Sequence, residues 1–264
     1  MIFLARLLGL LTLLAAAGCA STGDADPRDP FEPANRAVYR FNEGFDEAIA
    51  RPVATAYHDT LPEEVRGRVR NFFSNIADIF IGVNNMLQGK FEDGVTDWAR
   101  FVFNSTFGLL GLHDICSDLG LEKHNEDFGQ TFGRWGAGPG PYLILPILGS
   151  STVRDGIGTG IDIYADPVGD FRPIELRNSA VVLRLVNTRA DLLDASRILE
   201  EAALDKYTFQ RDAYLQRRRS LIYDGQPPRE PQSAAPAENA YPPHVPRNYD
   251  AVMATLDSSH EANR

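Results

Sequence analysis

The chain has 264 residues, a formal net charge of −10 and 44% hydrophobic residues. A nucleic-acid binder would carry a basic face, so this charge argues against that class of partner. It also argues against electrostatic docking on anionic lipid, so any entry into a membrane has to be driven by the burial of apolar surface.

Residues 1–18 are predicted to be a signal peptide. One basic residue precedes an apolar core that is too short to span a bilayer and has the layout of a secretory signal. Small residues then lead to Cys19, as in the lipobox of a bacterial lipoprotein, although Ala16 stands where Leu is usual. We therefore expect acyl chains on Cys19 and a lipidated tether over residues 19–29. An ordinary signal peptide with an incidental cysteine is the alternative.

The residues around the anchor also bear on location and stability. Position 20 is Ala and not Asp, which by analogy with enteric sorting rules favours the outer membrane. Cys116 is the only other cysteine, so lipidation of Cys19 leaves no intrachain disulfide. An exported chain of this kind has to be stabilised by its core instead.

Residues 30–224 show a mostly helical pattern, and we expect one all-α domain there. A first helix is predicted over residues 35–49, where apolar residues recur at spacings of three and four. Pro52 is expected to interrupt or kink it. The apolar positions of this helix are Val38, Phe41, Phe45 and Ile49.

The clearest apolar stripe begins after Pro62 and ends at Gly89. Proline is tolerated in a first helical turn, and the two glutamates that follow suit the positive end of a helix dipole. A third helix is predicted over residues 91–102, and two later ones over 180–204 and 207–223. Stripes of this kind usually face a core, but the density of phenylalanine leaves room for helices that bury apolar faces in lipid.

Residues 136–156 combine glycines, prolines and a short apolar run. Pro146 lies within that run and argues against a strand. The glycine-rich part is not a phosphate-binding loop, because Pro139 and Pro141 each remove a backbone amide donor. After the apolar run, the Arg154–Asp155 pair is expected to mark the point where the chain returns to polar surroundings.

No catalytic motif emerges from the sequence. A lipase would need a Gly-x-Ser-x-Gly elbow, which Ser150 and Ser151 do not complete. His113 and Cys116, with His124 nearby, supply zinc ligands poorly. We expect them to form a polar loop with Cys116 partly buried, and we predict no metal site, no cofactor and no enzymatic activity.

The far end of the chain has a different composition. Between Pro227 and Pro246 lie seven of the 17 prolines, separated mainly by Ala, Ser, Glu and Gln. Such a segment cannot bury a core, so residues 225–264 are predicted to be a disordered tail.

Several blocks of the sequence, in order, resemble the MlaA/VacJ lipoproteins. The resemblance covers nearly all of residues 29–224. It departs from the family at Pro33-Ala34, where Gly-Phe is frequent, and in the long tail. The blocks are DPFEPANRAVYRFNEGFD (29–46), RPVATAYHDTLP (51–62), VRNFFSNIADIFIGVNNMLQGKFEDGVTDWARFVFNSTFGLLGLHDI (69–115), GLEKHNEDFGQTFGRWGAGPGPYLILPILGSSTVRDGIG (120–158) and NTRADLLDAS (187–196).

The resemblance implies a single ring-like helical domain over residues 30–224, partly embedded in one membrane leaflet, with an amphipathic central channel. It implies a lipoprotein anchored in the periplasmic leaflet of a Gram-negative outer membrane. Such a protein removes mislocalised phospholipids from the outer leaflet and so maintains lipid asymmetry. The implied partners are phospholipids, a trimeric porin, and a periplasmic lipid carrier that serves an MCE-type ABC transport system.

The resemblance also implies a site. The segment 128–149 resembles a hairpin beside the channel, with an apolar tip that includes Tyr142 and Leu143. A segment near the channel carries Tyr39, Phe41 and Asn42, and Phe128 is the expected apolar partner of Phe41. Contact between the two segments is expected to hold the channel closed. Glycines are expected to permit a sharp reversal of the hairpin, and they are Gly129, Gly133, Gly136, Gly138 and Gly140.

Two other functions remain as alternatives. One is a structural adaptor that only links porins to envelope components. The other is a phospholipid hydrolase, which would use Ser150, Ser151 or Cys116 as its nucleophile.

Overall fold

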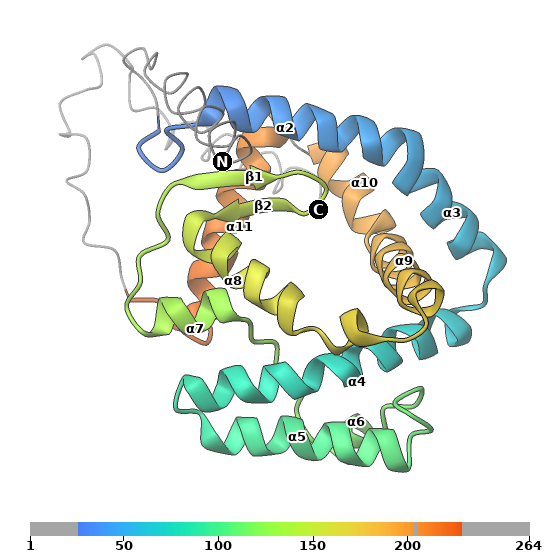
Figure 1. The fold of residues 1–264 in the computed structure, drawn as a ribbon. Helices are drawn as coiled ribbons and strands as arrows, with labels where there is room; N and C mark the ends of the chain where they lie inside the picture. Colours follow the sequence, from blue (N-terminus) through green and yellow to red (C-terminus); the bar gives the residue numbers. More distant parts are fainter. Residues whose placement is uncertain (1–25, 203–204, 229–264) are drawn as a thin grey trace, which may run out of the picture. The chain divides into compact units, whose positions relative to one another are not determined.

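The computed structural model describes residues 26–202 and 205–228 (Figure 1). Cys19, the predicted signal peptide and almost all of the predicted tail lie outside the described residues. The expectation of an all-α fold is confirmed, with the addition of one two-stranded antiparallel hairpin.

The first helix is longer than predicted and contains a wider turn. α2 (Glu32–Phe45) continues through a π-helical turn, η2 (Asp46–Ala50), into α3 (Arg51–Thr60). Pro52, which was expected to interrupt or kink the helix, lies in the first turn of α3, directly after the π-helical turn. A proline ring clashes with the carbonyl four residues before it, and the wider turn at η2 accommodates that clash.

Two long helices form the next hairpin. α4 (Glu63–Leu87) and α5 (Phe91–Thr106) are joined at Gly89, whose φ of 81° suits glycine. The two helices approach closely at two glycines. A Cβ at Gly82 would lie 2.5 Å from the Trp98 side chain, and one at Gly94 would lie 2.9 Å from Met86. A short helix, α6 (Ile115–Asp118), follows on the return.

The segment predicted to reverse is a helix followed by a β-hairpin. α7 (Phe128–Arg134) leads through a loop to β1 (Tyr142–Leu145), which pairs with β2 (Gly149–Thr152). Pro146 was taken as an argument against a strand in this run, but it lies in the turn directly after a four-residue strand and takes no ladder position.

The chain then returns to helices. α8 (Val153–Ala165) and the 3₁₀ turn η3 (Pro167–Asp170) precede α9 (Ile174–Asp191), α10 (Leu193–Ala202) and α11 (Lys206–Ile222). The helix predicted over 180–204 is thus two helices that meet at Leu192.

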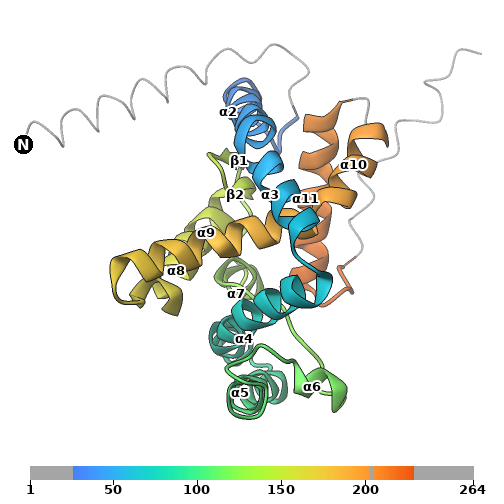
Figure 2. The same cartoon turned by 90° about the vertical axis from the view of Figure 1, so that its right-hand side faces the viewer.

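Within residues 26–227 the elements contact one another in a closed circuit (Figure 1). α2 contacts β1, β1 pairs with β2, and β2 contacts α8. The circuit continues from α8 to α7, from α7 to α4, and from α4 to α9. It closes through α3, which contacts α9 and continues from α2 through η2. α5 packs on α4, and α11 contacts both α7 and β2 (Figure 2).

The polarity of the interior is the reverse of that of an ordinary soluble domain. Among the described residues, ten hydrophobic side chains are buried, against 18 polar or charged ones. One hydrophobic cluster joins the hairpin to α2 and α11, through Tyr142, Ile144 and Tyr207. In soluble proteins polar side chains are usually exposed and apolar ones are usually buried. The reason for the opposite distribution here has to be sought in the environment of the protein surface.

Candidate functional site

Asn42 holds the turn of the β-hairpin against α2. Its side-chain amide donates to the carbonyl of Leu145 at 3.0 Å, and its carbonyl oxygen accepts from the amide of Ile147 at 2.8 Å. Ile147 has a φ of 66°, in the left-handed region that β-branched residues rarely adopt. Both bonds of Asn42 thus go to backbone groups on either side of Pro146, and they fix the turn in a strained conformation.

A second asparagine on α2 fixes the base of the hairpin. The Asn35 amide donates to Asp29 at 2.8 Å and to the Tyr142 carbonyl at 3.0 Å, while its oxygen accepts from the Ile144 amide at 2.9 Å. Asn35 and Asn42 lie seven residues apart, two turns along the same face of α2. One helix face therefore binds β1 at both of its ends.

The structure separates the other predicted site residues. Tyr39 packs edge-on against Tyr207, with ring centres 5.7 Å apart, and is part of the core. Phe41 is 56% exposed and does not pack in that core. Among the ring contacts of the described residues, Phe128 pairs with Phe132 and not with Phe41, so the expected partnership of Phe41 and Phe128 is not found.

Tyr142 was expected at an apolar tip but is completely buried. Its hydroxyl lies 2.8 Å from the Ser150 Oγ, which also accepts from the Gln210 amide at 2.8 Å. Leu143, on the opposite face of β1, is half-buried. The exposed apolar part of the hairpin is instead its turn, at Ile147 and Leu148.

The five glycines of this segment fall into three groups. Gly129 and Gly133 lie inside α7, where a Cβ would meet Asp155 or Arg218 at 2.7 Å and Ile222 at 2.9 Å, so they serve close packing and not a reversal. Gly136 and Gly140 have φ of 94° and 67° and do permit the loop to reverse. Gly138 has open space around it.

A buried charge network supports the base of the hairpin, and sequence reasoning did not find it. Arg218 donates to Asp127 at 2.6 and 2.9 Å and to Asp155 at 3.1 Å. Asp155 also accepts from Tyr214 at 2.8 Å and from Arg154 at 2.8 Å. The Arg154–Asp155 pair was expected to mark a return to polar surroundings, and it lies among polar side chains that are buried and not at the surface. The one feature of the sequence that could have pointed to this network is the run of three arginines at residues 217–219.

These ion pairs change the protonation equilibria nearby. Burial opposes the low pKa of the Asp127 and Asp155 carboxyls, but Arg218 lowers the pKa of both below the usual value. Asp162 has no such partner in the described residues, and burial, with a smaller contribution from the charge of Asp127, raises its pKa to about 6.

The cysteine and histidine cluster has a structural role. Cys116 is completely buried, not partly as expected, and burial raises the pKa of its thiol. His124 contacts Asp97 at 3.0 Å. Within residues 26–202 and 205–228, no group of His, Cys, Asp and Glu could hold a metal ion.

α5 is polar on its buried face and apolar on its exposed one. Asn85 donates to Asp97 at 2.7 Å, Arg100 binds Asp114 at 2.7 Å, and Asn104 donates to the same carboxylate at 2.9 Å. The opposite face continues into the loop after the helix. Its exposed residues are Phe91, Val95, Trp98, Val102, Phe103, Phe107, Leu109 and Leu110.

The polar groups on that exposed face are satisfied internally. The indole N–H of Trp98 donates to the Ile79 carbonyl at 3.0 Å. The hydroxyls of Thr96 and Thr106 donate to carbonyls four residues earlier, at 2.9 and 2.7 Å. Elsewhere, Trp135 is exposed at the C-terminal end of α7 and donates to the Leu87 carbonyl at 2.9 Å. We call the exposed apolar residues of α5 and of the loop after it the α5 apolar face; the indole and hydroxyl groups among them have hydrogen-bond partners within the protein.

No helix in the described ranges has the length and apolar content that crossing a bilayer requires. In the described residues the fold is that of a mostly helical protein with many buried polar side chains and an apolar helix face exposed on the surface. The family description "MlaA lipoprotein" matches residues 27–221. The chain belongs to this family.

Several relatives support that assignment. The intermembrane phospholipid transport system lipoprotein MlaA of Escherichia coli is 35% identical over 215 residues, covering 79% of this chain and 85% of that protein. The protein of the same name from Haemophilus influenzae is 28% identical, covering 83% and 90%. A solved structure from work on the structural basis for maintenance of bacterial outer membrane lipid asymmetry has a TM-score of 0.65 and 33% identity, covering 74% of this chain and 98% of that one.

Proposed function

We propose that this chain is an outer-membrane lipoprotein that removes mislocalised phospholipids from the outer leaflet and passes them to a periplasmic carrier. Relatives that bear the name of an intermembrane phospholipid transport lipoprotein align with more than three quarters of the chain. The proposal includes the Cys19 anchor and a position in the periplasmic leaflet of a Gram-negative outer membrane.

The α5 apolar face is the observation that carries the proposal. Phe91 and Phe107 are 66% and 65% exposed at opposite ends of α5, and between them Val95, Trp98, Val102 and Phe103 are exposed as well. In hydrocarbon every polar group has to be satisfied within the protein, and the indole and hydroxyl groups of this face meet that requirement. Such a helix can lie within one leaflet without crossing it.

The closed circuit of elements supplies the second part of the proposal. A lipid that moves between a leaflet and the periplasm needs a path for its polar head group, and we place that path through the ring of helices. The hairpin β1–β2 forms part of the ring, and Asn42 fixes its turn. We propose that release of the Asn42 contacts alters whether this path is open or closed. We also propose that Phe41, which is exposed and adjacent to Asn42 in sequence, lies along the path.

The proposed partners are those that the resemblance implies. We propose that the ring associates with a trimeric porin, which surrounds it with protein on the membrane side. The periplasmic carrier would deliver its lipid to an MCE-type ABC transport system. The chemistry is transfer without a covalent step, so no nucleophile and no cofactor are needed.

Liposome flotation tests the apolar face without the acyl anchor. A Cys19→Ala protein should float with vesicles of phosphatidylethanolamine and phosphatidylglycerol, and a further Val95→Asp change should reduce the floating fraction severalfold. Gln216→Glu adds the same charge on the exposed side of α11 and should leave flotation unchanged. Failure of the Cys19→Ala body to float at all would contradict the embedding.

Transfer itself is tested in cells. Loss of the protein should expose phospholipid on the cell surface and raise detergent sensitivity, and the wild-type chain should restore both. Native mass spectrometry of the purified protein should also find phospholipid together with a porin. Unchanged surface phospholipid after loss of the protein would overturn the proposed function.

A further inference from the structure

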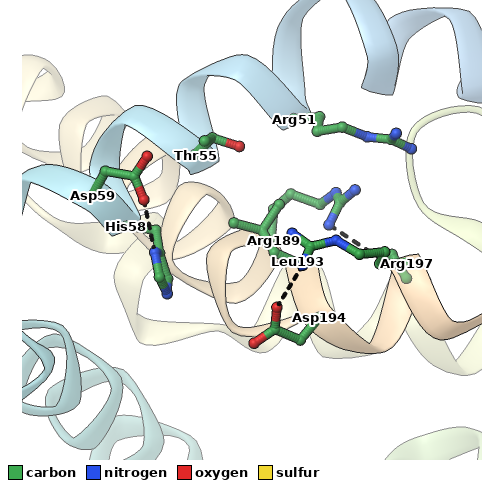
Figure 3. A pocket seen from close by; sticks show the side chains of 9 residues that line it. Arg51, Thr55, His58, Asp59, Arg189, Leu193, Asp194 and Arg197 are labelled. Carbon is green, nitrogen blue, oxygen red and sulfur yellow. Dashed lines mark hydrogen bonds and ion pairs between the residues drawn. The ribbon is translucent and has the colours of Figure 1, made fainter.

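The cavity between α3, α9 and α10, of about 280 Å³, is lined by charges that are paired within the protein (Figure 3). Asp46 contacts Arg189 at 2.6 Å and Arg51 at 3.3 Å. Asp194 lies 3.8 Å from Arg197. These pairs give no indication of a charged ligand. A different feature, the strained loop that follows α5, does point to a binding partner.

The loop of residues 107–112 has the sequence FGLLGL and holds two consecutive leucines in the left-handed region. Leu109 has a φ of 54° and Leu110 a φ of 60°. This conformation brings Cβ too close to the following carbonyl oxygen, and among residues with a side chain it is mainly Asn and Asp that tolerate it. Two neighbouring leucines are therefore poorly suited to this backbone, and strain of this kind is often found where the side chains have a function.

The fold fixes this strained conformation. Gly108 and Gly111, which flank the two leucines, are buried, and a Cβ on Gly111 would lie 2.6 Å from the Asn75 side chain. The amide of Leu110 donates to the Ser105 carbonyl at 3.0 Å. The loop is thus packed against α4 through a glycine and bonded to the last turns of α5 through its backbone.

The same geometry turns the two leucine side chains outward. Leu109 and Leu110 are 64% and 71% exposed, and Phe107 and Leu112 on either side of them are exposed as well. None of the six residues of the loop has a polar side chain. The loop therefore continues the α5 apolar face beyond the C-terminal end of the helix.

Two observations favour hydrocarbon over a protein partner as the occupant of this surface. Protein interfaces carry about one hydrogen bond per 100–200 Å², and residues 107–112 offer no side-chain donor or acceptor. Backbone groups of the loop are also bonded internally. The Gly108 carbonyl accepts from the amide of His113 at 2.9 Å, and the Leu109 carbonyl accepts from the amide of Leu112 at 3.3 Å. Hydrocarbon requires such internal pairing.

We propose that the loop of residues 107–112 is a rigid wedge that inserts Leu109 and Leu110 among the acyl chains of the leaflet. Contact with lipid accounts for two leucines at positions whose backbone suits asparagine or glycine better. The inference rests on the proposed embedding in one leaflet. It adds that these two leucines promote membrane binding although they reduce the stability of the fold.

Replacement of both leucines by asparagine separates these two effects. Asparagine adopts the left-handed region readily, but its amide is unfavourable in hydrocarbon. In the Cys19→Ala protein, the double variant Leu109→Asn, Leu110→Asn should float severalfold less than its parent with vesicles of phosphatidylethanolamine and phosphatidylglycerol. Its Tm in detergent should not fall, because the strain is relieved. A fall in both flotation and Tm would assign the leucines to the fold and not to the membrane.

Leu119→Asn is the matched control. Leu119 follows the last turn of α6 and is 67% exposed, but the neighbouring Asp118 and Glu122 are exposed and charged. This variant should float like the parent. Equal flotation of the double variant and the parent would overturn the wedge and leave the proposed embedding intact, whereas failure of the parent to float would overturn both.

A depth measurement tests the insertion directly. In the Cys19→Ala protein bound to such vesicles, an NBD label on Leu110→Cys should be quenched by lipids that carry a doxyl group on the acyl chain. The same label on Leu119→Cys should not be quenched. Cys116 is completely buried and should not take up the label. Equal quenching at the two positions would contradict the insertion of the loop.

Discussion

The amide of Ile147 donates to the side-chain oxygen of Asn42 across 105 positions of sequence, and this bond holds a β-branched residue at a φ of 66°. The conformation of the hairpin turn thus depends on a side chain of α2. An unsupported turn would relax toward a less strained geometry, since left-handed conformations of such residues cost of order 1–3 kcal/mol.

Asn42→Ala should loosen the hairpin selectively. The change removes two hydrogen bonds to backbone groups, and we expect a loss of about 1–2 kcal/mol of local stability. Amide exchange at residues 144–150 should accelerate about tenfold or more, while exchange in α4 stays at its wild-type rate. Unchanged exchange in the turn would show that Asn42 does not hold it.

Ile147→Gly should be more stable than Ile147→Ala. Both changes remove the exposed side chain, but only glycine adopts a positive φ without steric cost. The expected difference is about 1 kcal/mol, which corresponds to roughly 2–4 °C in Tm for a domain of this size. Thermal unfolding followed by circular dichroism in detergent measures it, and equal stability of the two variants would argue against strain at this position.

Arg218→Met should destabilise the fold strongly. The change leaves Asp127 without its cation and takes one of two cations from Asp155, which keeps Arg154. Loss of one partner of a buried pair costs about 3–5 kcal/mol, and the expected loss lies at the lower end of that range because Asp127 is 36% exposed. Arg217→Met is the matched control on the adjacent, exposed position of α11, where the effect should stay within about 0.5 kcal/mol. Similar losses in the two variants would remove the special role of Arg218.

Asp162 should make stability depend on pH. Its pKa is raised to about 6 in the folded protein, from an ordinary value of 3.8, mainly by burial. The folded state therefore holds the proton more tightly, so this stabilisation is complete below pH 4 and is lost as the pH rises to about 6.

Asp162→Asn should abolish that dependence. At pH 7 the variant should be more stable than the wild type by about 1 kcal/mol, a value reduced by the partial exposure of the group. At pH 4 the two proteins should unfold at the same temperature. Parallel stability curves between pH 4 and 7 would contradict the raised pKa.

The helices with strong apolar periodicity could be predicted from the sequence. Whether the apolar face of each helix is buried or exposed could not. α5 was expected from Phe91, Val95, Trp98 and Val102, and the helix is present. These residues are exposed, while the polar positions between them are buried. A stripe at helical spacing has the same period whether it faces a core or a membrane, so periodicity alone does not decide between them.

The site was less predictable, because it depends on contacts between distant segments. Asn42 was named from the resemblance, and the structure places it against the hairpin, but the turn that it binds follows a strand that Pro146 seemed to exclude. Arg218 pairs with residues 91 and 63 positions away, and nothing in a run of three arginines indicates which one is buried.

The α5 apolar face stays exposed after folding, and this affects how the protein is transported as well as where it functions. An ordinary exported domain loses its tendency to aggregate once it has folded, because its apolar side chains are then buried. Here folding leaves Phe91, Phe107 and their neighbours uncovered. Under the proposed function, transit through an aqueous compartment to the membrane therefore calls for an escort that covers the folded protein and not only its unfolded chain.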